Sequence, residues 1–230
     1  MPPKDIDLAV LGSTGFTGAL VAKFLSTQTS AKYHLCGRSA GKLERLRQSL
    51  LSAKNPPAGV VVCDTSSYAS CLALTTRSVV VLSLVGPFDA LGRLVVAACV
   101  EGGCHYCDIT GETPTFAKWS VSTQHAAAAA AKVKIVHCCG YDSVPSDVLA
   151  HQCVEAIRAA GGTPDYVSMA ADGFETVGAP STGTVSTALS ISGAAMAAQF
   201  ADPHFLDDAK RMVKGWWAES GTSSRRRRRV

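Results

Sequence analysis

The sequence predicts an α/β protein built on a doubly wound parallel sheet, followed by the start of a second, incomplete α+β domain. Three observations predict it. Short apolar segments alternate with amphipathic ones over residues 1–140, the order expected of strands joined by helical crossovers. The apolar run Ser78–Leu84 suits a strand buried on both faces of a parallel sheet. The first apolar segment leads directly into three glycines spaced three apart, which is typical of a Rossmann-type nucleotide-binding turn.

Each strand is predicted from a short apolar segment bounded by glycine, proline or polar residues. The predicted strands are Asp7–Leu11, Lys32–Cys36, Gly59–Cys63, Ser78–Leu84, His105–Ile109 and Val133–Cys138. The segments between them predict helices at Thr14–Thr27, Ala40–Ala53, Tyr68–Thr75 and Gly92–Gly102, and a further helix that includes Ala126–Ala131. We therefore expect one NAD(P)-binding domain over residues 1–140.

The alternation ends after the sixth strand. Ser143–Asp147 has the composition of a capped helix start with a proline in its first turn, and this helix is expected to reach about Ala160. A strand at Asp165–Ala171 and a helix of small residues at 182–200 follow. We predict a partial substrate or dimerisation domain at 141–214 and a disordered arginine-rich tail at 215–230.

The glycines Gly12, Gly15 and Gly18 have the chemistry of a phosphate site. Glycine has no Cβ atom, so the chain can turn tightly and a pyrophosphate can approach the backbone. The amides that begin the next helix then point at the phosphates, and the helix dipole favours their charge. Because the spacing is G-x-x-G-x-x-G and not the usual G-x-G-x-x-G, an ordinary glycine-rich loop is the alternative.

The end of the second strand favours NADP over NAD. An acidic residue that holds the ribose hydroxyls of NAD is expected about 20 residues after the glycine turn, and Arg38 stands there instead. An arginine can form a bidentate pair with the 2′-phosphate of NADP, with Ser39 and Lys42 as helpers. The alternative is a solvated arginine at a strand end.

The ends of the third and fourth strands complete the predicted cofactor site, because ligands of doubly wound sheets bind where the strands end. Asp64 is expected to face the adenine, or else to cap a helix at Thr65–Ser67. Gly86 and Pro87 are expected on the nicotinamide side, or else form an ordinary turn. The predicted cofactor contacts are Gly12, Ser13, Thr14, Gly15, Phe16, Thr17, Gly18, Arg38, Ser39, Asp64, Gly86 and Pro87.

Three side chains near the ends of the fifth and sixth strands are candidates for the proton donor that hydride transfer to a carbonyl or imine requires. They are Glu112, Tyr141 and Asp142. The structural alternatives are a surface position for Glu112 and a helix cap formed by Asp142 or Ser143. The catalytic residue therefore stays open at the level of sequence.

Composition excludes some classes of protein. Hydrophobic residues make up 47% and charged residues 17% of the 230 residues, which suits a large core and not a disordered chain. The net charge of +4 includes the five arginines at 225–229, so the rest of the chain is near −1 and does not indicate a nucleic-acid partner. Residues 176–201 carry no charge, but their small side chains predict a buried amphipathic helix and not a membrane span.

The nine cysteines and the polar N-terminus, which lacks a signal peptide, predict a reducing compartment and therefore the cytoplasm. Cys104 and Cys107 form a C-x-x-C pattern, which can bind a metal or act in redox chemistry. If both lie on one strand, they are about 10 Å apart and on opposite faces. No second C-x-x-C completes a zinc site, so we predict buried thiols and no metal.

Taken in order, the strand-end motifs resemble the saccharopine-dehydrogenase-like oxidoreductase family, which includes trans-acting enoyl reductases and eukaryotic relatives on membranes or lipid droplets. The motifs that carry the resemblance are Gly12–Gly18, Cys36–Arg38, Val85–Phe88, Ala98–Glu112 and His137–Asp147, with a weaker one at Gly183–Ser186. The resemblance implies a Rossmann domain that binds NAD(P), with cofactor contacts at Gly12, Gly15, Gly18 and Arg38, and then a substrate domain with a mixed sheet.

The resemblance also sets expectations for the whole chain. Family chains are longer, so the second domain here would lack strands and the segment that returns to the first domain, leaving an exposed sheet edge or apolar patch. We expect an NADP-dependent oxidoreductase that acts on a small, lipid-derived molecule, in the cytoplasm or peripherally on membranes or lipid droplets. Homodimerisation stays open. The alternative is a non-catalytic nucleotide-binding or interaction protein.

Overall fold

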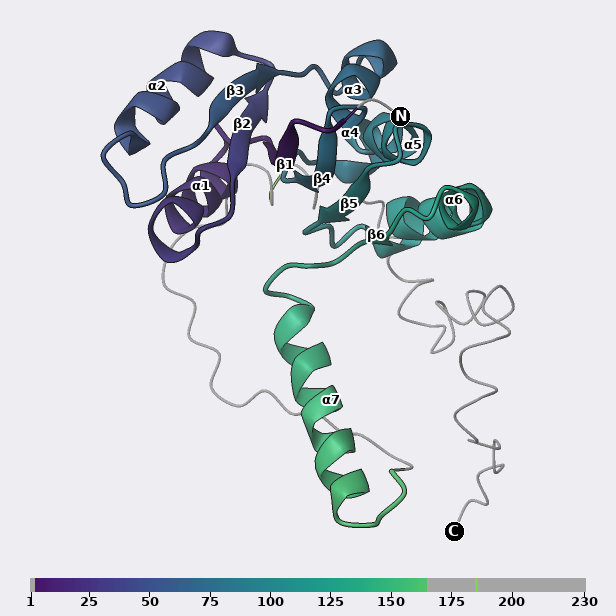
Figure 1. The fold of residues 1–230 in the computed structure, drawn as a ribbon. Helices are drawn as coiled ribbons and strands as arrows, with labels where there is room; N and C mark the ends of the chain where they lie inside the picture. The colour runs from purple at the N-terminus through teal and green to yellow at the C-terminus, as the bar shows by residue number, and fades with distance from the viewer. Residues whose placement is uncertain (1–2, 165–184, 186–230) are drawn as a thin grey trace.

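The chain forms a central parallel sheet with helices on both faces (Figure 1). The structure, a computed structural model, describes residues 3–164 and Val185. The six strands run in the order β3-β2-β1-β4-β5-β6. Their bounds are β1 Ile6–Leu11, β2 Tyr33–Gly37, β3 Gly59–Val62, β4 Ser78–Ser83, β5 His105–Asp108 and β6 Ile135–Val136. Each predicted strand is present, and the doubly wound α/β class is confirmed.

Two layers of helices cover the sheet. The helices are α1 Phe16–Gln28, α2 Ala40–Leu50, α3 Tyr68–Thr75, α4 Phe88–Leu91, α5 Arg93–Glu101, α6 Lys118–Ala130 and α7 Val144–Ala159, with a π-helical turn, η1, at Thr113–Ala117. Helices α1 and α2 bury Leu25 and Leu43 against β1 and β2. Helices α3 and α5 pack on the opposite face, through Leu74 and Val95.

The strand order reverses beside β1, and this reversal positions the site. The chain passes from β1 to β2 and β3 on one side, and then crosses to β4 on the other side of β1. Leu11 and Ser83 are paired at the ends of β1 and β4, and the Leu84 amide donates to the Leu11 carbonyl at 2.9 Å. The ends of these two strands therefore form the switch point at which doubly wound sheets bind ligands.

The sixth strand is shorter than the sequence predicts. The predicted segment Val133–Cys138 contributes only Ile135–Val136 to the sheet. The Cys138 amide turns instead to the Asp108 carboxylate, at 3.2 Å, and Cys138 has a positive φ of 61°. A side chain on the neighbouring strand therefore ends β6, which the apolar pattern of the segment does not reveal.

Helix α7 begins at Val144 with Pro145 in its first turn, as predicted, although Ser143 makes no side-chain capping hydrogen bond. None of its residues is buried, and it extends away from the sheet (Figure 1). The predicted strand at Asp165–Ala171, the predicted helix at 182–200 and the arginine-rich tail lie outside the described residues.

Helix α1 carries a row of exposed apolar side chains, Phe16, Leu20 and Phe24, which are 72%, 54% and 58% exposed. They are spaced four residues apart and so share one side of the helix. Helix α1 therefore presents an exposed apolar patch, whereas the patch expected at the second domain stays a prediction. Among the helices of residues 3–164, none has both the length and the apolar composition to cross a membrane.

Candidate functional site

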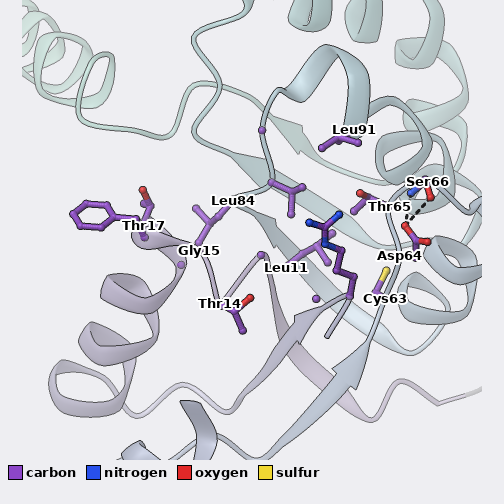
Figure 2. A pocket seen from close by; sticks show the side chains of 17 residues that line it. Leu11, Thr14, Gly15, Thr17, Cys63, Asp64, Thr65, Ser66, Leu84 and Leu91 are labelled. Carbon is purple, nitrogen blue, oxygen red and sulfur yellow. Dashed lines mark hydrogen bonds between the residues drawn. The ribbon is translucent and has the colours of Figure 1, made fainter. Parts of the chain in front are cut away.

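A cleft of about 580 Å³ runs across the carboxyl ends of β3, β2, β1 and β4. Figure 2 shows Thr14, Gly15 and Thr17 on one side of it, and Asp64 and Ser66 at its far end. The lining residues are Leu11, Gly12, Thr14, Gly15, Phe16, Thr17, Gly18, Gly37, Arg38, Cys63, Asp64, Thr65, Ser66, Leu84, Val85, Gly86 and Leu91. The cleft thus brings together most of the residues predicted to contact the cofactor.

Two glycines of the turn after β1 occupy positions that no other residue fits. Gly12 has a φ of +88°, and a Cβ there would lie 2.8 Å from the side chain of Val85. A Cβ on Gly18 would lie 2.1 Å from the Gly12 carbonyl oxygen. The first glycine therefore permits the turn, and Gly18 lets helix α1 lie against it.

The turn is fixed to its neighbours by backbone hydrogen bonds. The amides of Gly12 and Ser13 both donate to the Cys36 carbonyl, at 2.9 and 3.2 Å. The Ser13 side chain is fully buried, donates to the Val10 carbonyl and accepts from the Cys36 amide. It therefore joins β1 to β2 behind the turn, and Ser13, unlike its neighbours Gly12 and Thr14, lies outside the cleft lining.

The start of helix α1 suits a pyrophosphate. The helix begins at Phe16 after an N-cap glycine, Gly15, and no side chain caps it. Its first turn contains no acidic residue, and the first amides of a helix have no partner within the helix. With the dipole, these amides favour an anion in the cleft beside Gly15 and Thr17. The glycine cradle and this uncapped helix start therefore fit a dinucleotide.

The charged side chains of the cleft lining, Arg38 and Asp64, lie at the end of the cleft formed by β2 and β3. Arg38 follows β2 and is exposed, and Asp64 follows β3. Asp64 Oδ1 accepts hydrogen bonds from the Ser66 amide at 3.0 Å and the Ser66 hydroxyl at 2.7 Å. These bonds, with a smaller contribution from Arg38, lower the pKa of the Asp64 carboxyl. The helix cap of α3 is Ser67 and not Asp64, and Ser39 lies outside the cleft lining.

The opposite end of the cleft is apolar. Leu84, Val85 and Gly86 follow β4, and Leu91 comes from α4. The predicted contact Pro87 lies next to this wall but outside the lining residues. The side chains of Leu84, Val85 and Leu91 make this end of the lining apolar.

The three candidate proton donors lie apart from the cleft lining. Tyr141 is 76% exposed and Asp142 is also exposed. Glu112 is only 1% exposed, so its surface alternative is wrong. Its two carboxylate oxygens accept hydrogen bonds from the amides of Phe88 and Asp89, each at 2.8 Å, at the start of α4.

Sequence reasoning missed a buried pair formed by Asp108 and His137. His137 Nδ1 lies 2.7 Å from Asp108 Oδ2, and the two side chains are 9% and 0% exposed. The imidazole packs edge-on against the rings of Tyr106 and Phe116. Asp108 ends β5 and His137 directly follows the neighbouring strand β6, within the two long motifs at 98–112 and 137–147, and these positions at strand ends were the available signal.

The C-x-x-C cysteines lie on β5 or directly before it. Cys104 is fully buried and Cys107 is half-buried, and both thiols are free. Within residues 3–164, no cluster of histidine, cysteine and carboxylate side chains is arranged to hold a metal ion.

Comparison with protein families and known proteins agrees with this geometry. Residues 8–136 match the family model described as the saccharopine dehydrogenase NADP-binding domain. Among solved structures, the described fold is similar to apo saccharopine dehydrogenase (L-Glu forming) from Saccharomyces cerevisiae. That match has a TM-score of 0.54 and 16% identity, and covers 68% of this chain and 32% of the yeast chain.

Curated relatives come from mycobacteria. A Mycobacterium tuberculosis protein, provisionally named as a trans-acting enoyl reductase, is 33% identical over 236 residues, which cover 99% of this chain and 55% of that protein. The trans-acting enoyl reductase of Mycobacterium leprae is 37% identical over 150 residues, which cover 65% of this chain and 35% of that protein. The chain thus spans about half the length of the curated relatives it matches.

Proposed function

The chain belongs to the family of the saccharopine dehydrogenase NADP-binding domain, and from that membership we propose that it is an NADP-dependent oxidoreductase. NADP is its cofactor. The names of its mycobacterial relatives support an enoyl group as the substrate, that is, a carbon–carbon double bond conjugated to a carbonyl on a lipid-derived acyl chain. A cytoplasmic location, peripheral membrane association and dimer formation stay predictions.

The observation that carries the proposal is the cleft, which joins the glycine turn after β1 to an arginine at one end and an apolar wall at the other. In the proposed complex, the amides after Gly15 bind the pyrophosphate and the Arg38 guanidinium pairs with the 2′-phosphate. Leu84 and Leu91 border the nicotinamide and keep water from it. When bound, NADPH supplies the hydride.

The proton for this reaction has no evident donor in the cleft lining. The ionisable side chains among the described lining residues are Arg38, Cys63 and Asp64, and all three lie at the β2–β3 end. Tyr141 and Asp142 stay predicted donors outside the described cleft lining. This distribution supports a second candidate function, in which the chain binds NADP without reducing a substrate.

The cofactor preference is tested with Arg38→Gln. Charged hydrogen bonds contribute about 1.5–3 kcal/mol, so we expect the Kd for NADPH to rise about 10- to 100-fold and that for NADH to change less than about twofold. Cofactor fluorescence titration measures both. The matched control is Arg45→Gln, an exposed arginine on α2 outside the cleft lining. Equal affinity of the unmodified chain for NADPH and NADH would contradict the role of Arg38.

Turnover separates the two candidate functions. A reductase consumes NADPH in the presence of an enoyl thioester, and the loss of NADPH absorbance follows the reaction. NADPH binding without oxidation by enoyl, carbonyl or imine substrates would favour the binding protein. Absence of NADPH binding would overturn both.

A further inference from the structure

The cleft wall after β4 includes a glycine, where no side chain covers the backbone. Leu84, Val85 and Gly86 line the cleft, and helix α4 begins two residues later at Phe88. Gly86 has no side chain, so the position of its peptide groups determines the local shape of the wall. In the proposed complex this wall faces the nicotinamide, because it lies at the opposite end of the cleft from Arg38.

Glu112 fixes the segment that follows this wall. Its Oε1 accepts from the Phe88 amide and its Oε2 from the Asp89 amide, both at 2.8 Å. Helix α4 has no side-chain cap of its own, since its N-cap residue is Pro87. The Glu112 carboxylate, which lies 24 residues after Phe88 and 23 after Asp89, thus accepts hydrogen bonds from the first two amides of the four-residue helix α4.

The loop that carries Glu112 is itself held by the ends of β5 and β6. The Glu112 amide donates to Thr110 Oγ1 at 3.0 Å, and the Thr110 amide donates to Asp108 Oδ1 at 3.0 Å. The same Asp108 oxygen accepts from the Cys138 amide, and Asp108 Oδ2 meets His137. A continuous chain of hydrogen bonds therefore runs from the loop after β6 to the start of α4, two residues beyond the wall of the cleft.

Burying a carboxylate to cap the short helix α4 costs more free energy than a local N-cap side chain would. A serine, threonine or aspartate at the N-cap would satisfy these amides locally, and an ionised carboxylate in the interior needs full pairing to be tolerated. What Glu112 adds is a rigid connection between the β4 wall and the β5 loop. Such rigidity matters where a reacting ring must be held, because a misplacement of about 1 Å can cost on the order of 100-fold in rate.

We propose that Glu112 is a positioning residue for the nicotinamide: through the first two amides of α4, it holds the Leu84–Gly86 wall in the shape that accepts the ring. The inference rests on the proposed function, because it assumes that NADPH lies across the cleft. Glu112 touches neither cofactor nor substrate in this arrangement. It differs from the predicted proton donor, since both its oxygens accept backbone hydrogen bonds.

The test compares two ligands on Glu112→Gln. The glutamine keeps one acceptor oxygen but turns an NH₂ group toward the second amide. Adenosine 2′,5′-bisphosphate carries the adenosine half of NADPH with its 2′-phosphate and has no nicotinamide. We expect its Kd to change less than about twofold, while the Kd for NADPH rises about tenfold and the fluorescence gain of the bound nicotinamide falls.

Glu44→Gln is the matched control, because it removes the same charge from a partly exposed side chain on α2. If Glu112→Gln does not fold, Thr110→Val carries the test, because it removes the oxygen that holds the Glu112 amide and keeps the shape of the side chain. Equal weakening of both ligands, or no weakening of NADPH, would overturn the inference. A parent chain that binds neither ligand would instead contradict the proposed function.

Discussion

At the scale of single residues, the cleft depends most on Gly18. A methyl group on this residue would meet the Gly12 carbonyl oxygen at 2.1 Å and Ser13 Cα at 2.7 Å, and both atoms belong to the backbone. Neither can rotate away, so Gly18→Ala must shift the turn or the helix. We expect a loss of about 1–3 kcal/mol in unfolding free energy and at least about tenfold weaker NADPH binding. Urea unfolding and fluorescence titration measure the two effects.

Gly41→Ala provides the contrast. A Cβ on Gly41 would meet only the end of the Arg45 side chain, at 3.8 Å, on an exposed turn of α2. Alanine is the better helix former, so this change is expected to stabilise the protein by up to about 1 kcal/mol. If both substitutions had the same effect, the close approach of α1 to the turn would not be what Gly18 provides.

The residues of the site differ in how far sequence could predict them. Gly12, Arg38 and Asp64 come within two residues of strand ends, so the parallel sheet alone brings them to one edge. The contact between Glu112 and α4 depends on the path of a loop 24 residues further along. No spacing rule describes that path, and the sequence therefore suggested a proton donor or a surface residue where the structure has a buried helix cap.

At the scale of elements, Lys4 connects two helices to the sheet. Its ammonium donates to the carbonyls of Ser78 and Gly103, each at 2.7 Å, and of Gly102 at 3.2 Å, with Thr75 at 3.5 Å. These carbonyls end α3 and α5 and begin β4. A cation at the carboxyl ends of two helices also interacts favourably with both dipoles.

Lys4→Met should therefore destabilise the protein by about 1–3 kcal/mol, because the methionine keeps the apolar stem but leaves these carbonyls without their donor. Urea unfolding measures the loss. Lys23→Met, an exposed lysine of α1, is the control and should change stability by less than about 0.5 kcal/mol. Equal effects would mean that Lys4 acts only through its charge.

The sequence predicts a helix or strand correctly where the burial of one of its faces determines the local pattern of apolar residues. The six strands and α1, α2, α3 and α5 were predicted because apolar periodicity reports which face is buried. Helix α4 and η1 were not predicted. Helix α4 starts where Glu112 satisfies its amides, and β6 ends where Asp108 takes the Cys138 amide. The start of α4 and the end of β6 are thus both set by side chains distant in sequence. A pattern of neighbouring residues therefore cannot predict either boundary.

At the scale of the whole molecule, the core and the cleft that the structure describes are formed by residues that precede α7. Among residues 3–164, the buried apolar side chains lie between Ile6 and Val133, and the cleft lining lies between Leu11 and Leu91. The hydrogen-bonded loop after β6 ends before Val144, and no residue of α7 is buried. A unit of about 140 residues has the size of an ordinary independent domain.

A fragment of residues 1–140 is therefore expected to fold cooperatively and to bind NADPH with a Kd within about twofold of the full chain. Urea unfolding tests the folding, and fluorescence titration tests the binding. Saturation with NADPH at about 100 times its Kd should stabilise both proteins equally, by about 2.7 kcal/mol. A fragment that unfolds without a transition, or that binds NADPH more than about tenfold more weakly, would mean that residues after 140 form part of the cofactor domain, and the predicted boundary there would be wrong.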